Sequence, residues 1–540
     1  MSKSIEEQRK GNFSTPELFI KEAYKYISEE LGENWNKKDS NIVWDCSCGE
    51  ANLTRNLEFT NLYLSTLEQK DIDFFINNNY NPKAIYFQFD FLNDINLSTK
   101  LPDEYLIADL KLNKEVIFLI NPPYATSTDN NRTGKEKSGV SKTEVNKSML
   151  EDKMGLSSRQ LYCQFLYRIL KIKQEYNLSN VTICIFSPIS FIVANSYKKF
   201  MEKFEQEFNF QKGFIFRASN FDEVTSKWNV GFTIWSSSKP KKDYVLDIKE
   251  VERGNIVNYG VKKLFRAEIP LGESIQKNYK NLVDAPQMSS ALKYKQEGKG
   301  KWLEGSFGFF FNGSNNIGSS EHNMGIFSSP YSNNQGFSIT KENFRQVIEC
   351  FTAKKVVKSN WTNWQDEFSS PNINHPEFQQ FSNDAIVYSL FETKSNQSSL
   401  RNILYKNKLY DIKNEFFWMS KLEMEKLALK HEFFELYQDA LKSENERYVY
   451  ILLKELKLSE DALEVLDLAS DLVRESFIYR EEFHLKNPDY HLDSFDCGYS
   501  QIKTLCKEFI PEKMKEFRNK YKQFEKRLYP IVFELELLRK

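Results

Sequence analysis

The chain has 540 residues, too many for one hydrophobic core, and its length predicts two or three domains. Hydrophobic residues make up 40% and aromatic residues 15%, which excludes a disordered chain. The 74 Lys and Arg are balanced by 75 Asp and Glu, so any nucleic-acid contact must come from local basic patches. Three such patches lie at 293–301, 354–358 and 513–527, although an ordinary solvated face is the simpler explanation of each.

The first ten residues are charged and polar, and no apolar run reaches the roughly 18 to 20 residues that a membrane span needs. We therefore expect a cytoplasmic, monomeric protein without membrane contact. The seven cysteines are scattered, and Cys46 and Cys48 have no second Cys or His pair at zinc-ligand spacing. The sequence thus predicts neither a metal site nor a disulfide.

The first predicted element is a helix that ends near Leu31. Ser14 and Thr15 supply a capping hydroxyl, and Pro16 suits the first helical position. Short apolar runs then alternate with helical or polar stretches, and helices at about 158–176 and 195–208 separate the later runs. This alternation predicts a mostly parallel α/β sheet. The runs are 42–44, 62–67, 84–89, 116–120, 181–186, 213–216 and 230–235.

A polar segment interrupts this pattern between residues 125 and 157. It is rich in Ser, Thr, Lys, Asn and Gly and is longer than an ordinary loop of a compact domain. We interpret it as a mobile loop that orders on a nucleic acid, the alternative being an unimportant flexible insertion. Its basic residues are Arg132, Lys135, Lys137, Lys142, Lys147 and Lys153.

The alternating pattern is lost beyond about residue 240. Residues 241–400 are turn-rich, with isolated aromatic residues, and predict a linker followed by mixed, irregular structure. From about residue 415 the apolar spacing becomes helical, which predicts a mainly helical C-terminal domain over 401–540. Together with the α/β region at 1–240, these segments give three predicted domains.

Three strand ends carry residues suited to a nucleoside cofactor. In an open α/β sheet, ligands bind at the carboxyl ends of the strands, where backbone N–H groups can approach them. Asp45 to Thr54 follow the first strand, with Gly49 suited to a sharp turn. Glu68 follows the second strand and can accept hydrogen bonds from ribose hydroxyls. After the third strand, Asp90 can bind the amine of an adenine while Phe91 covers its face, with Asp94 a less favoured substitute for Asp90.

Asn121-Pro122-Pro123-Tyr124 follows the fourth strand. The two prolines remove backbone donors and fix φ, leaving carbonyl groups directed rigidly into a cleft. An amino nitrogen conjugated to a purine ring is a poor nucleophile. Hydrogen bonds from its N–H groups to the Asn121 side chain and the Pro122 carbonyl would draw its lone pair out of the ring plane. Tyr124 could then stack on a base extruded from a duplex.

In this order, the motifs resemble the N6-adenine DNA methyltransferases of the gamma arrangement, within the amino-methyltransferase family, over about residues 11–240. The resemblance implies a Rossmann-like, seven-stranded class I methyltransferase domain whose last strand is antiparallel. It implies S-adenosylmethionine as the methyl donor, no metal, and double-stranded DNA recognised by the C-terminal region. We place this target recognition in residues 280–400, where Trp361, Trp364 and Arg345 lie among predicted turns and are candidates for groove contacts, the alternative being that they belong to the core. The catalytic residues it implies are Asn121, Pro122, Pro123 and Tyr124. The cofactor-binding residues are Thr15, Pro16, Asp45, Cys46, Ser47, Gly49, Asn52, Leu53, Glu68, Asp90, Phe91 and Asn121.

Two positions depart from the family's pattern or leave a choice open. Ala51 stands where the family commonly has a second glycine, and its methyl group could crowd the cofactor. A second aromatic residue should complete a sandwich around the base. Phe221 and Trp228 are both candidates, and we favour Phe221.

The expected activity is transfer of a methyl group to N6 of a flipped adenine in double-stranded DNA, either alone or beside a cognate restriction endonuclease. N4 of cytosine is an alternative acceptor, although such enzymes more often begin the tetrapeptide with Ser. RNA bases and protein glutamine are others, but those enzymes are generally compact. A bifunctional restriction–modification enzyme is less favoured because Pro488-Asp489 lacks a convincing Glu-x-Lys partner. A non-catalytic DNA-binding module is the last alternative.

Overall fold

The computed structural model describes residues 14–100, 104–112, 114–126, 142–221, 228–275, 282–331, 335–431 and 441–539. The chain forms two compact units. One contains Met1–Arg266 and Asn360–Asp366, and the other contains Ala267–Ser359 and Glu367–Arg539. The expected boundaries at 240 and 400 do not coincide with the edges of these units.

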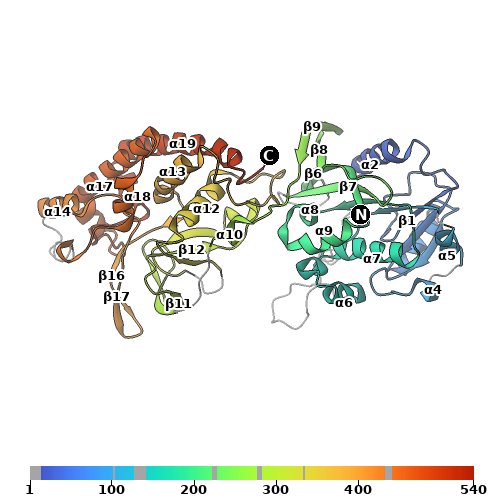
Figure 1. The fold of residues 1–540 in the computed structure, drawn as a ribbon, viewed down its shortest axis with the longest axis horizontal. Coiled ribbons are helices and arrows are strands. Elements are labelled where there is room, and N and C mark those ends of the chain that lie inside the picture. The colour runs from blue at the N-terminus through green and yellow to red at the C-terminus, as the bar shows by residue number, and fades with distance from the viewer. Residues whose placement is uncertain are drawn as a thin grey trace. The chain divides into compact units, whose positions relative to one another are not determined.

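The first unit is built on a nine-stranded sheet of order β3-β2-β1-β4-β5-β7-β6-β8-β9 (Figure 1). Strands β1 to β5 pair in parallel, whereas β7 runs antiparallel to both β5 and β6. The α/β class and the antiparallel strand agree with expectation. The bounds are β1 (Asn41–Asp45), β2 (Leu62–Thr66), β3 (Ile85–Gln88), β4 (Glu115–Ile120), β5 (Val181–Ser187), β6 (Asn209–Arg217), β7 (Asn229–Ser236), β8 (Val245–Glu252) and β9 (Asn255–Lys263).

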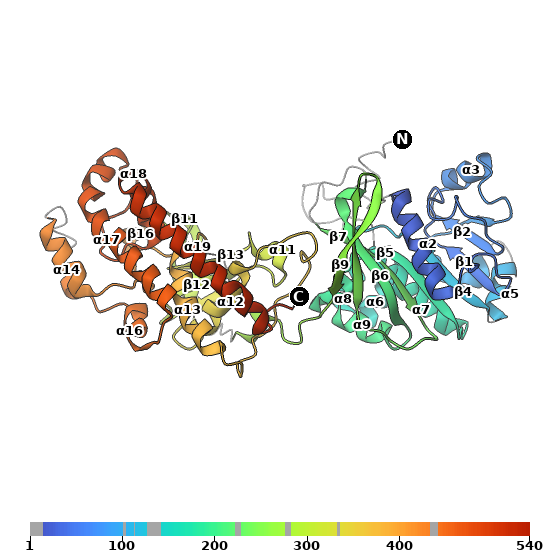
Figure 2. The same cartoon turned by 90° about the horizontal axis from the view of Figure 1, so that it is seen from above.

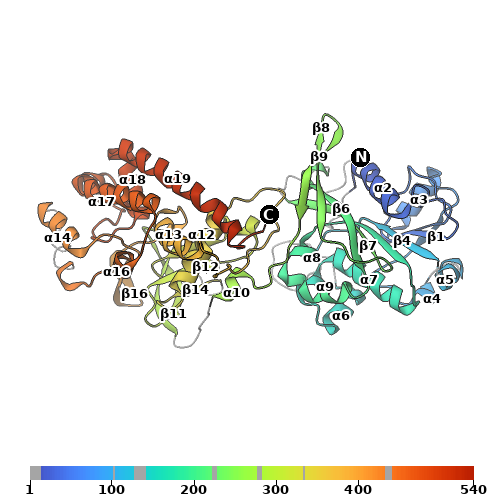
Figure 3. The same ribbon diagram turned by 45° about the horizontal axis from the view of Figure 1, so that its top comes forward.

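The sheet has nine strands rather than the expected seven. β8 pairs in parallel with β6 and in antiparallel with β9, and the pair extends the edge of the sheet (Figure 3). Most residues of β9 are exposed, so this strand carries no apolar run for a sequence pattern to detect. The first unit therefore continues past residue 240.

Helices cover both faces of this sheet (Figure 2). Ile42 and Phe118 face the core formed with α7 (Leu161–Glu175) and α9 (Lys198–Phe204). Val43 and Ile117 face the opposite core, formed with α2 (Glu17–Leu31) and α3 (Gln69–Asn77). Because both faces are buried, the strands read as continuous apolar runs. The other helical elements of this unit are α4 (Leu97–Lys100), α5 (Glu104–Lys111), α8 (Ser190–Val193), η2 (Asn195–Tyr197) and η3 (Ala218–Asn220).

The expected mobile segment 125–157 is partly ordered, so its prediction as one long loop is wrong. Residues 144–151 form α6 (Glu144–Glu151), capped by Thr143, whose side chain accepts a hydrogen bond from the backbone N–H of Asn146. The 3-10 helix η1 (Gly155–Arg159) follows, and Thr126 forms a β-bridge with Gln160. Thr143 is a favourable N-cap residue and indicated the start of a helix, although the polar composition of the segment suggested a loop. Arg132, Lys135 and Lys137 lie outside the described residues, so ordering on a nucleic acid stays a prediction.

The second unit combines small sheets with a group of long helices. Its largest sheet has the order β14-β12-β13-β15, and β10–β11 and β16–β17 form separate antiparallel pairs. The long helices α17 and α19 pack against one another (Figure 1). The strands are β10 (Leu282–Met288), β11 (Tyr294–Leu303), β12 (Gly308–Asn312), β13 (Met324–Phe327), β14 (Phe337–Ile339), β15 (Ser395–Asn396), β16 (Leu400–Tyr405) and β17 (Lys408–Ile412). The helices are α10 (Leu271–Ser274), α11 (Ile317–Ser320), α12 (Phe344–Val356), α13 (Phe378–Phe391), α14 (Lys421–Lys430), α16 (Tyr448–Glu455), α17 (Glu460–Lys486), α18 (Tyr499–Phe509) and α19 (Pro511–Glu534).

A short segment from the C-terminal half, Asn360–Asp366, is built into the first unit. The Asn229 side-chain amide donates a hydrogen bond of 2.8 Å to the carbonyl of Trp361. Lys262 Nζ lies 2.6 Å from Asp366 Oδ2, with side-chain exposures of 9% and 13%. Burial raises the pKa of Asp366 although the Lys262 ammonium opposes that shift. The segment is thus held by a buried ion pair, whose members are expensive to separate.

Removing one member of this pair should destabilise the first unit strongly. Asp366→Ala leaves the Lys262 charge buried without its partner, and we expect a loss of about 3 kcal/mol in the free energy of unfolding. Lys263 and Asp243 form a matched exposed pair at 2.9 Å, with side-chain exposures of 47% and 75%. Asp243→Ala should therefore cost less than about 1 kcal/mol in urea unfolding. Equal losses for the two variants would contradict this account.

Candidate active site

Asn121 directly follows β4, and two side chains fix the orientation of its amide. Asn121 Nδ2 donates a hydrogen bond of 2.8 Å to Thr15 Oγ1. The hydroxyl of Tyr124 donates a hydrogen bond of 2.7 Å to Asn121 Oδ1. The donor end of the amide therefore faces Thr15, and its acceptor oxygen faces the Tyr124 hydroxyl. Thr15, predicted from the sequence as a cofactor residue, lies where it orients the predicted catalytic amide.

Tyr124 lies in contact with both candidate aromatic partners. Its ring centroid is 6.3 Å from that of Phe221 and 6.1 Å from that of Trp228, and both pairs are edge-to-face. Phe221 is only 2% exposed and packs against Phe216, whereas Trp228 is partly exposed. Burial raises the pKa of Tyr124 well above its ordinary value, so its hydroxyl remains a hydrogen-bond donor at neutral pH. Of the two rings, that of Trp228 is the more accessible to a ligand.

The turn after β1 has the conformation that the sequence predicted for Gly49. Gly49 has φ +47°, in the left-handed region that favours glycine. Ala51 has φ +56° and is fully buried, so it adopts a glycine-like conformation at a cost of about 1 to 2 kcal/mol. The alanine at position 51, where the family commonly has a glycine, therefore mainly adds backbone strain. A glycine would adopt this conformation without strain.

Buried polar groups gather at this turn. Asp45 ends β1, is 1% exposed, and accepts a hydrogen bond of 3.1 Å from the backbone N–H of Ser47. The Ser47 hydroxyl oxygen is buried without a hydrogen-bond partner among the described residues. Burial raises the pKa of Asp45 to about 8, the hydrogen bond from Ser47 opposing it. A ligand that brings a cationic amino group and a hydrogen-bond partner to this turn would satisfy both groups, as the amino-acid part of S-adenosylmethionine can.

The neighbouring predicted residues of this turn have structural contacts of their own. Cys46 and Cys48 are buried free thiols whose pKa values are raised well above the ordinary value, first of all by burial. The carbonyl of Leu53 accepts a hydrogen bond from the hydroxyl of Tyr24. Asn52 is partly exposed on the same turn, and Pro16 immediately precedes α2. Cys46, Cys48 and Leu53 thus shape the turn through buried groups.

The residues expected to bind the cofactor at the ends of β2 and β3 differ in their accessibility. Glu68 is exposed immediately before α3. The Asp90 carboxylate accepts hydrogen bonds of 3.1 Å from the backbone N–H groups of Leu92 and Asn93, so it closes its own turn. Phe91 is 3% exposed and stacks on Phe165 at 5.1 Å. Phe91 therefore belongs to the core in this structure, while Glu68 is accessible to a ligand.

Sequence reasoning did not identify two polar side chains at the same edge of the sheet. Ser187 ends β5, and Asn229 begins the antiparallel β7, two residues before Gly231, the partner of Ser187. The side-chain oxygens of both residues are buried without hydrogen-bond partners among the described residues. Asn229 also follows Trp228 and holds the carbonyl of Trp361. In the sequence, a polar residue directly beside an apolar run could have indicated both positions.

Some basic residues of two of the three patches are engaged within the fold, whereas Lys515 and Lys522 on α19 are exposed, as expected of a solvated face. Lys354 and Lys355 are buried, at 1% and 4% exposure, and donate hydrogen bonds to backbone carbonyls. Burial lowers the pKa of Lys355 to about 8. On α19, Lys520 and Arg527 form ion pairs with acidic residues, Asp461 among them. The patch at 354–358 is therefore not the solvated or DNA-facing surface that its sequence suggested.

The residues considered for target recognition also have internal partners. Trp361 lies in the segment built into the first unit, where the Arg217 guanidinium stands 5.5 Å from its ring centroid. Arg345 donates hydrogen bonds to Ser382 and Asn383 within the second unit. Their recognition role stays a prediction.

Within the described part of the chain, no group of three or more His, Cys, Asp and Glu side chains is arranged to hold a metal ion. The helices described include none with both the length and the apolar character needed to cross a membrane.

No protein-family model matches the chain, and no curated protein matches it. Among solved structures, the chain is similar to a DrdV–DNA complex at 14% identity and a TM-score of 0.32, over 48% of this chain and 28% of that one. It is similar to a modification subunit of a candidate type I restriction enzyme from Vibrio vulnificus at 11% identity and a TM-score of 0.30, over 47% and 49% of the two chains.

A third likeness is to a candidate class I S-adenosylmethionine-dependent methyltransferase from Listeria monocytogenes, at 11% identity and a TM-score of 0.29, over 49% of this chain and 67% of that one. The chain spans 28% and 49% of the length of the first two of these structures. TM-scores this low describe only partial likeness. Any inference about the function of this chain therefore rests on its own residues.

The protonation of Asp45 gives a test in the absence of any ligand. The folded protein holds this proton up to a pKa of about 8, against an ordinary value of 3.8. Because the folded state then binds the proton more tightly than the unfolded chain, this group makes the first unit less stable as pH rises between those two values. Asp45→Asn removes the titration. The variant should gain stability relative to the wild type between pH 5 and pH 9 in urea unfolding, whereas a constant difference would exclude the shifted pKa.

Proposed function

We propose that the first unit transfers a methyl group from S-adenosylmethionine to N6 of an adenine flipped out of double-stranded DNA. The observation that carries this proposal is the oriented amide of Asn121. Its oxygen accepts a hydrogen bond from the Tyr124 hydroxyl, next to an aromatic cluster, at the carboxyl end of a central parallel strand. This is the arrangement required to hold an amino group conjugated to a planar ring.

Asn121 and Pro122 position the acceptor nitrogen. An N–H group of the base replaces the Tyr124 hydroxyl at Asn121 Oδ1, and the second N–H donates to the Pro122 carbonyl. These two acceptors orient the nitrogen lone pair, and orientation of this kind supplies a large part of many rate accelerations. Thr15 keeps Asn121 from turning its amide nitrogen toward the substrate, because Thr15 Oγ1 accepts the hydrogen bond from Nδ2.

The turn from Asp45 to Leu53 is the proposed binding site for the cofactor. Asp45 and Ser47 supply the buried acceptor and hydroxyl suited to its amino-acid part, and Glu68 supplies an exposed carboxylate for its ribose. When bound, the cofactor supplies an electrophilic methyl group on a sulfonium. Burial disfavours the ionised form of Asp45, and the cationic amino group of the cofactor would offset that cost and lower its pKa.

Trp228 is the better candidate for the second face of the base sandwich. It contacts Tyr124 and is partly exposed, whereas Phe221 is buried against Phe216. This reverses the preference from sequence alone. Phe221 then supports the Tyr124 ring from the core.

DNA is preferred as the acceptor because a second, large unit follows the proposed catalytic unit. A large additional unit suits recognition of a long polymer. N4 of cytosine, RNA bases and protein glutamine present the same planar nitrogen chemistry to Asn121. The direct experiment supplies methyl-labelled cofactor with duplex DNA, RNA or protein. We expect label in duplex DNA, and label in RNA or protein alone would refute the proposed substrate.

Asn121→Ala should abolish methyl transfer while cofactor affinity stays within about twofold, because the side chain is hydrogen-bonded to Thr15 and Tyr124 beside the proposed acceptor position. Calorimetric titration with S-adenosylhomocysteine measures the affinity. Tyr124→Ala should slow transfer by removing a base stack worth about 1 to 3 kcal/mol. Loss of cofactor binding in Asn121→Ala, or wild-type turnover in Tyr124→Ala, would contradict these roles.

Thr15→Val should lower the turnover number about fivefold, because the lost hydrogen bond is worth about 1 kcal/mol and acts on Asn121 orientation. Thr60→Val is the matched control, since Thr60 is exposed and precedes β2 at the opposite, amino ends of the strands. Equal turnover in both variants, or a defect of Thr15→Val confined to cofactor affinity, would show that Thr15 does not position Asn121.

A further inference from the structure

The hairpin β16–β17 protrudes from the second unit (Figure 1). Lys406 and Asn407 both have positive φ, at +50° and +59°, as a tight two-residue hairpin turn requires. The sequence from 404 to 410, LYKNKLY, contains two lysines and no carboxylate. The turn is therefore narrow and carries two lysines, of which Lys406 is paired with Asp284.

One face of the hairpin is packed and the other carries exposed leucines. Ile403 and Tyr405 are buried, at 5% and 3% exposure, and Ile403 packs with Met288 and Phe309. Leu404 and Leu409 lie opposite one another across the two strands, on the outer face, and are 61% and 64% exposed. Exposing two paired leucines on a strand is unfavourable unless the face meets a partner.

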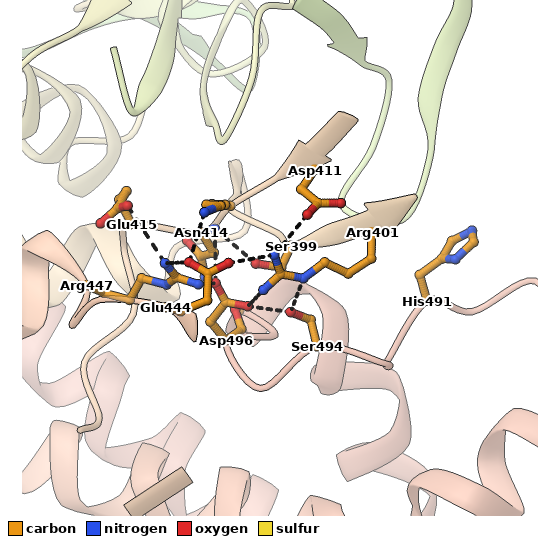
Figure 4. A network of polar contacts seen from close by, with 12 residues as sticks. Ser399, Arg401, Asp411, Asn414, Glu415, Glu444, Arg447, His491, Ser494 and Asp496 are labelled. Atoms are coloured by element: carbon orange, nitrogen blue, oxygen red, sulfur yellow. Dashed lines mark hydrogen bonds and ion pairs between the residues drawn. The ribbon is translucent and has the colours of Figure 1, made fainter. Parts of the chain in front are cut away.

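A buried polar network holds the base of the hairpin (Figure 4). Arg401 on β16 lies 3.1 Å from Glu444 and donates a hydrogen bond of 3.3 Å to Ser494. Arg447 lies 2.7 Å from Asp496, and their side chains are 3% and 0% exposed. Such buried charges are better explained by a fixed geometry than by added stability.

The other strand is tied to the same network. The backbone N–H of Asn414 donates a hydrogen bond of 2.9 Å to the Ser399 hydroxyl, and the Asn414 side chain donates one of 3.0 Å to the Asp496 carbonyl. Near the tip, Lys406 donates a hydrogen bond of 2.6 Å to Asp284 of β10. An isolated two-stranded hairpin is marginally stable. This one is fixed at its base and close to its turn.

The nearby acidic groups are already engaged. Asp411 accepts a hydrogen bond of 3.0 Å from the backbone N–H of Asn402 and lies 3.5 Å from Arg401. Asp284 is engaged by Lys406, whose ammonium lowers the pKa of that carboxyl. Lys408, exposed beside the leucines, thus contributes a positive charge that these carboxylates do not cancel.

We propose that the hairpin 400–412 lies in the major groove of duplex DNA, with Leu404 and Leu409 against base edges and Lys408 at a phosphate. This rests on the proposed function for its choice of polymer. A two-stranded ribbon fits the major groove, and the thymine methyl group is the apolar feature exposed there. The leucines lie on the flat face of the ribbon rather than at its turn, which favours groove contact over insertion between bases.

The test compares duplexes of one sequence that contain either thymine or uracil, which differ by the thymine methyl group. The full-length wild type should bind the thymine duplex more tightly in fluorescence anisotropy. L404S/L409S should bind both duplexes equally, and the thymine duplex about tenfold more weakly than wild type does. K408Q should reduce the slope of log affinity against log salt by about 0.9.

Matched controls come from α14, where Leu422 is 61% exposed and Lys426 is exposed. L422S and K426Q should bind like the wild type. A thymine preference retained by L404S/L409S, or absent from the wild type, overturns the inference. So does an L404S/L409S effect on self-association alone, measured by sedimentation. If the wild type methylates DNA while L404S/L409S binds normally, only the hairpin inference fails. If the wild type binds neither duplex, the proposal that DNA is the substrate fails as well.

Discussion

The orientation of one side-chain amide is the constraint on which the proposed site depends. Asn121 can accept a substrate N–H only if its oxygen faces the acceptor, and Thr15 fixes that orientation by taking the amide nitrogen. Thr15 immediately precedes Pro16, the residue before α2, and α2 packs against the sheet. The packing of α2 against the sheet thereby fixes the position of Thr15, and Thr15 in turn fixes the position of Asn121 Oδ1. Tyr124 occupies that atom with its hydroxyl, a hydrogen bond that an incoming amino group can replace.

The site also draws on a distant part of the sequence. Asn229 begins β7 beside Trp228 and holds the backbone of Trp361, while Lys262 holds Asp366 through a buried ion pair. The segment between these anchors is continuous on both sides with the second unit. The segment 360–366 is therefore hydrogen-bonded to the residue next to one of the two aromatic partners of Tyr124.

The sequence predicted the parts of the fold that bury apolar surface on both sides. The seven apolar runs coincide with β1 to β7, because strands buried on both faces of the sheet have a continuous hydrophobic pattern. The exposed β9 and the capped helix α6 lack that pattern and were missed. Residue types and spacing proposed Asn121, Tyr124 and Asp45, which the structure places at the ends of β4 and β1. They could not identify the partner of the Asn121 amide, the burial of Phe91 and Lys354, or the choice between Phe221 and Trp228, because these depend on long-range packing.

We propose above all that the oriented amide of Asn121 binds the exocyclic nitrogen of an adenine in duplex DNA. The most direct measurement is mass spectrometry of nucleosides from duplex DNA incubated with the protein and S-adenosylmethionine. The account predicts N6-methyladenine, formed by the wild type and absent with Asn121→Ala. N4-methylcytosine as the product would contradict the choice of base. Methylation of DNA by Asn121→Ala at the wild-type rate would contradict the role of the amide.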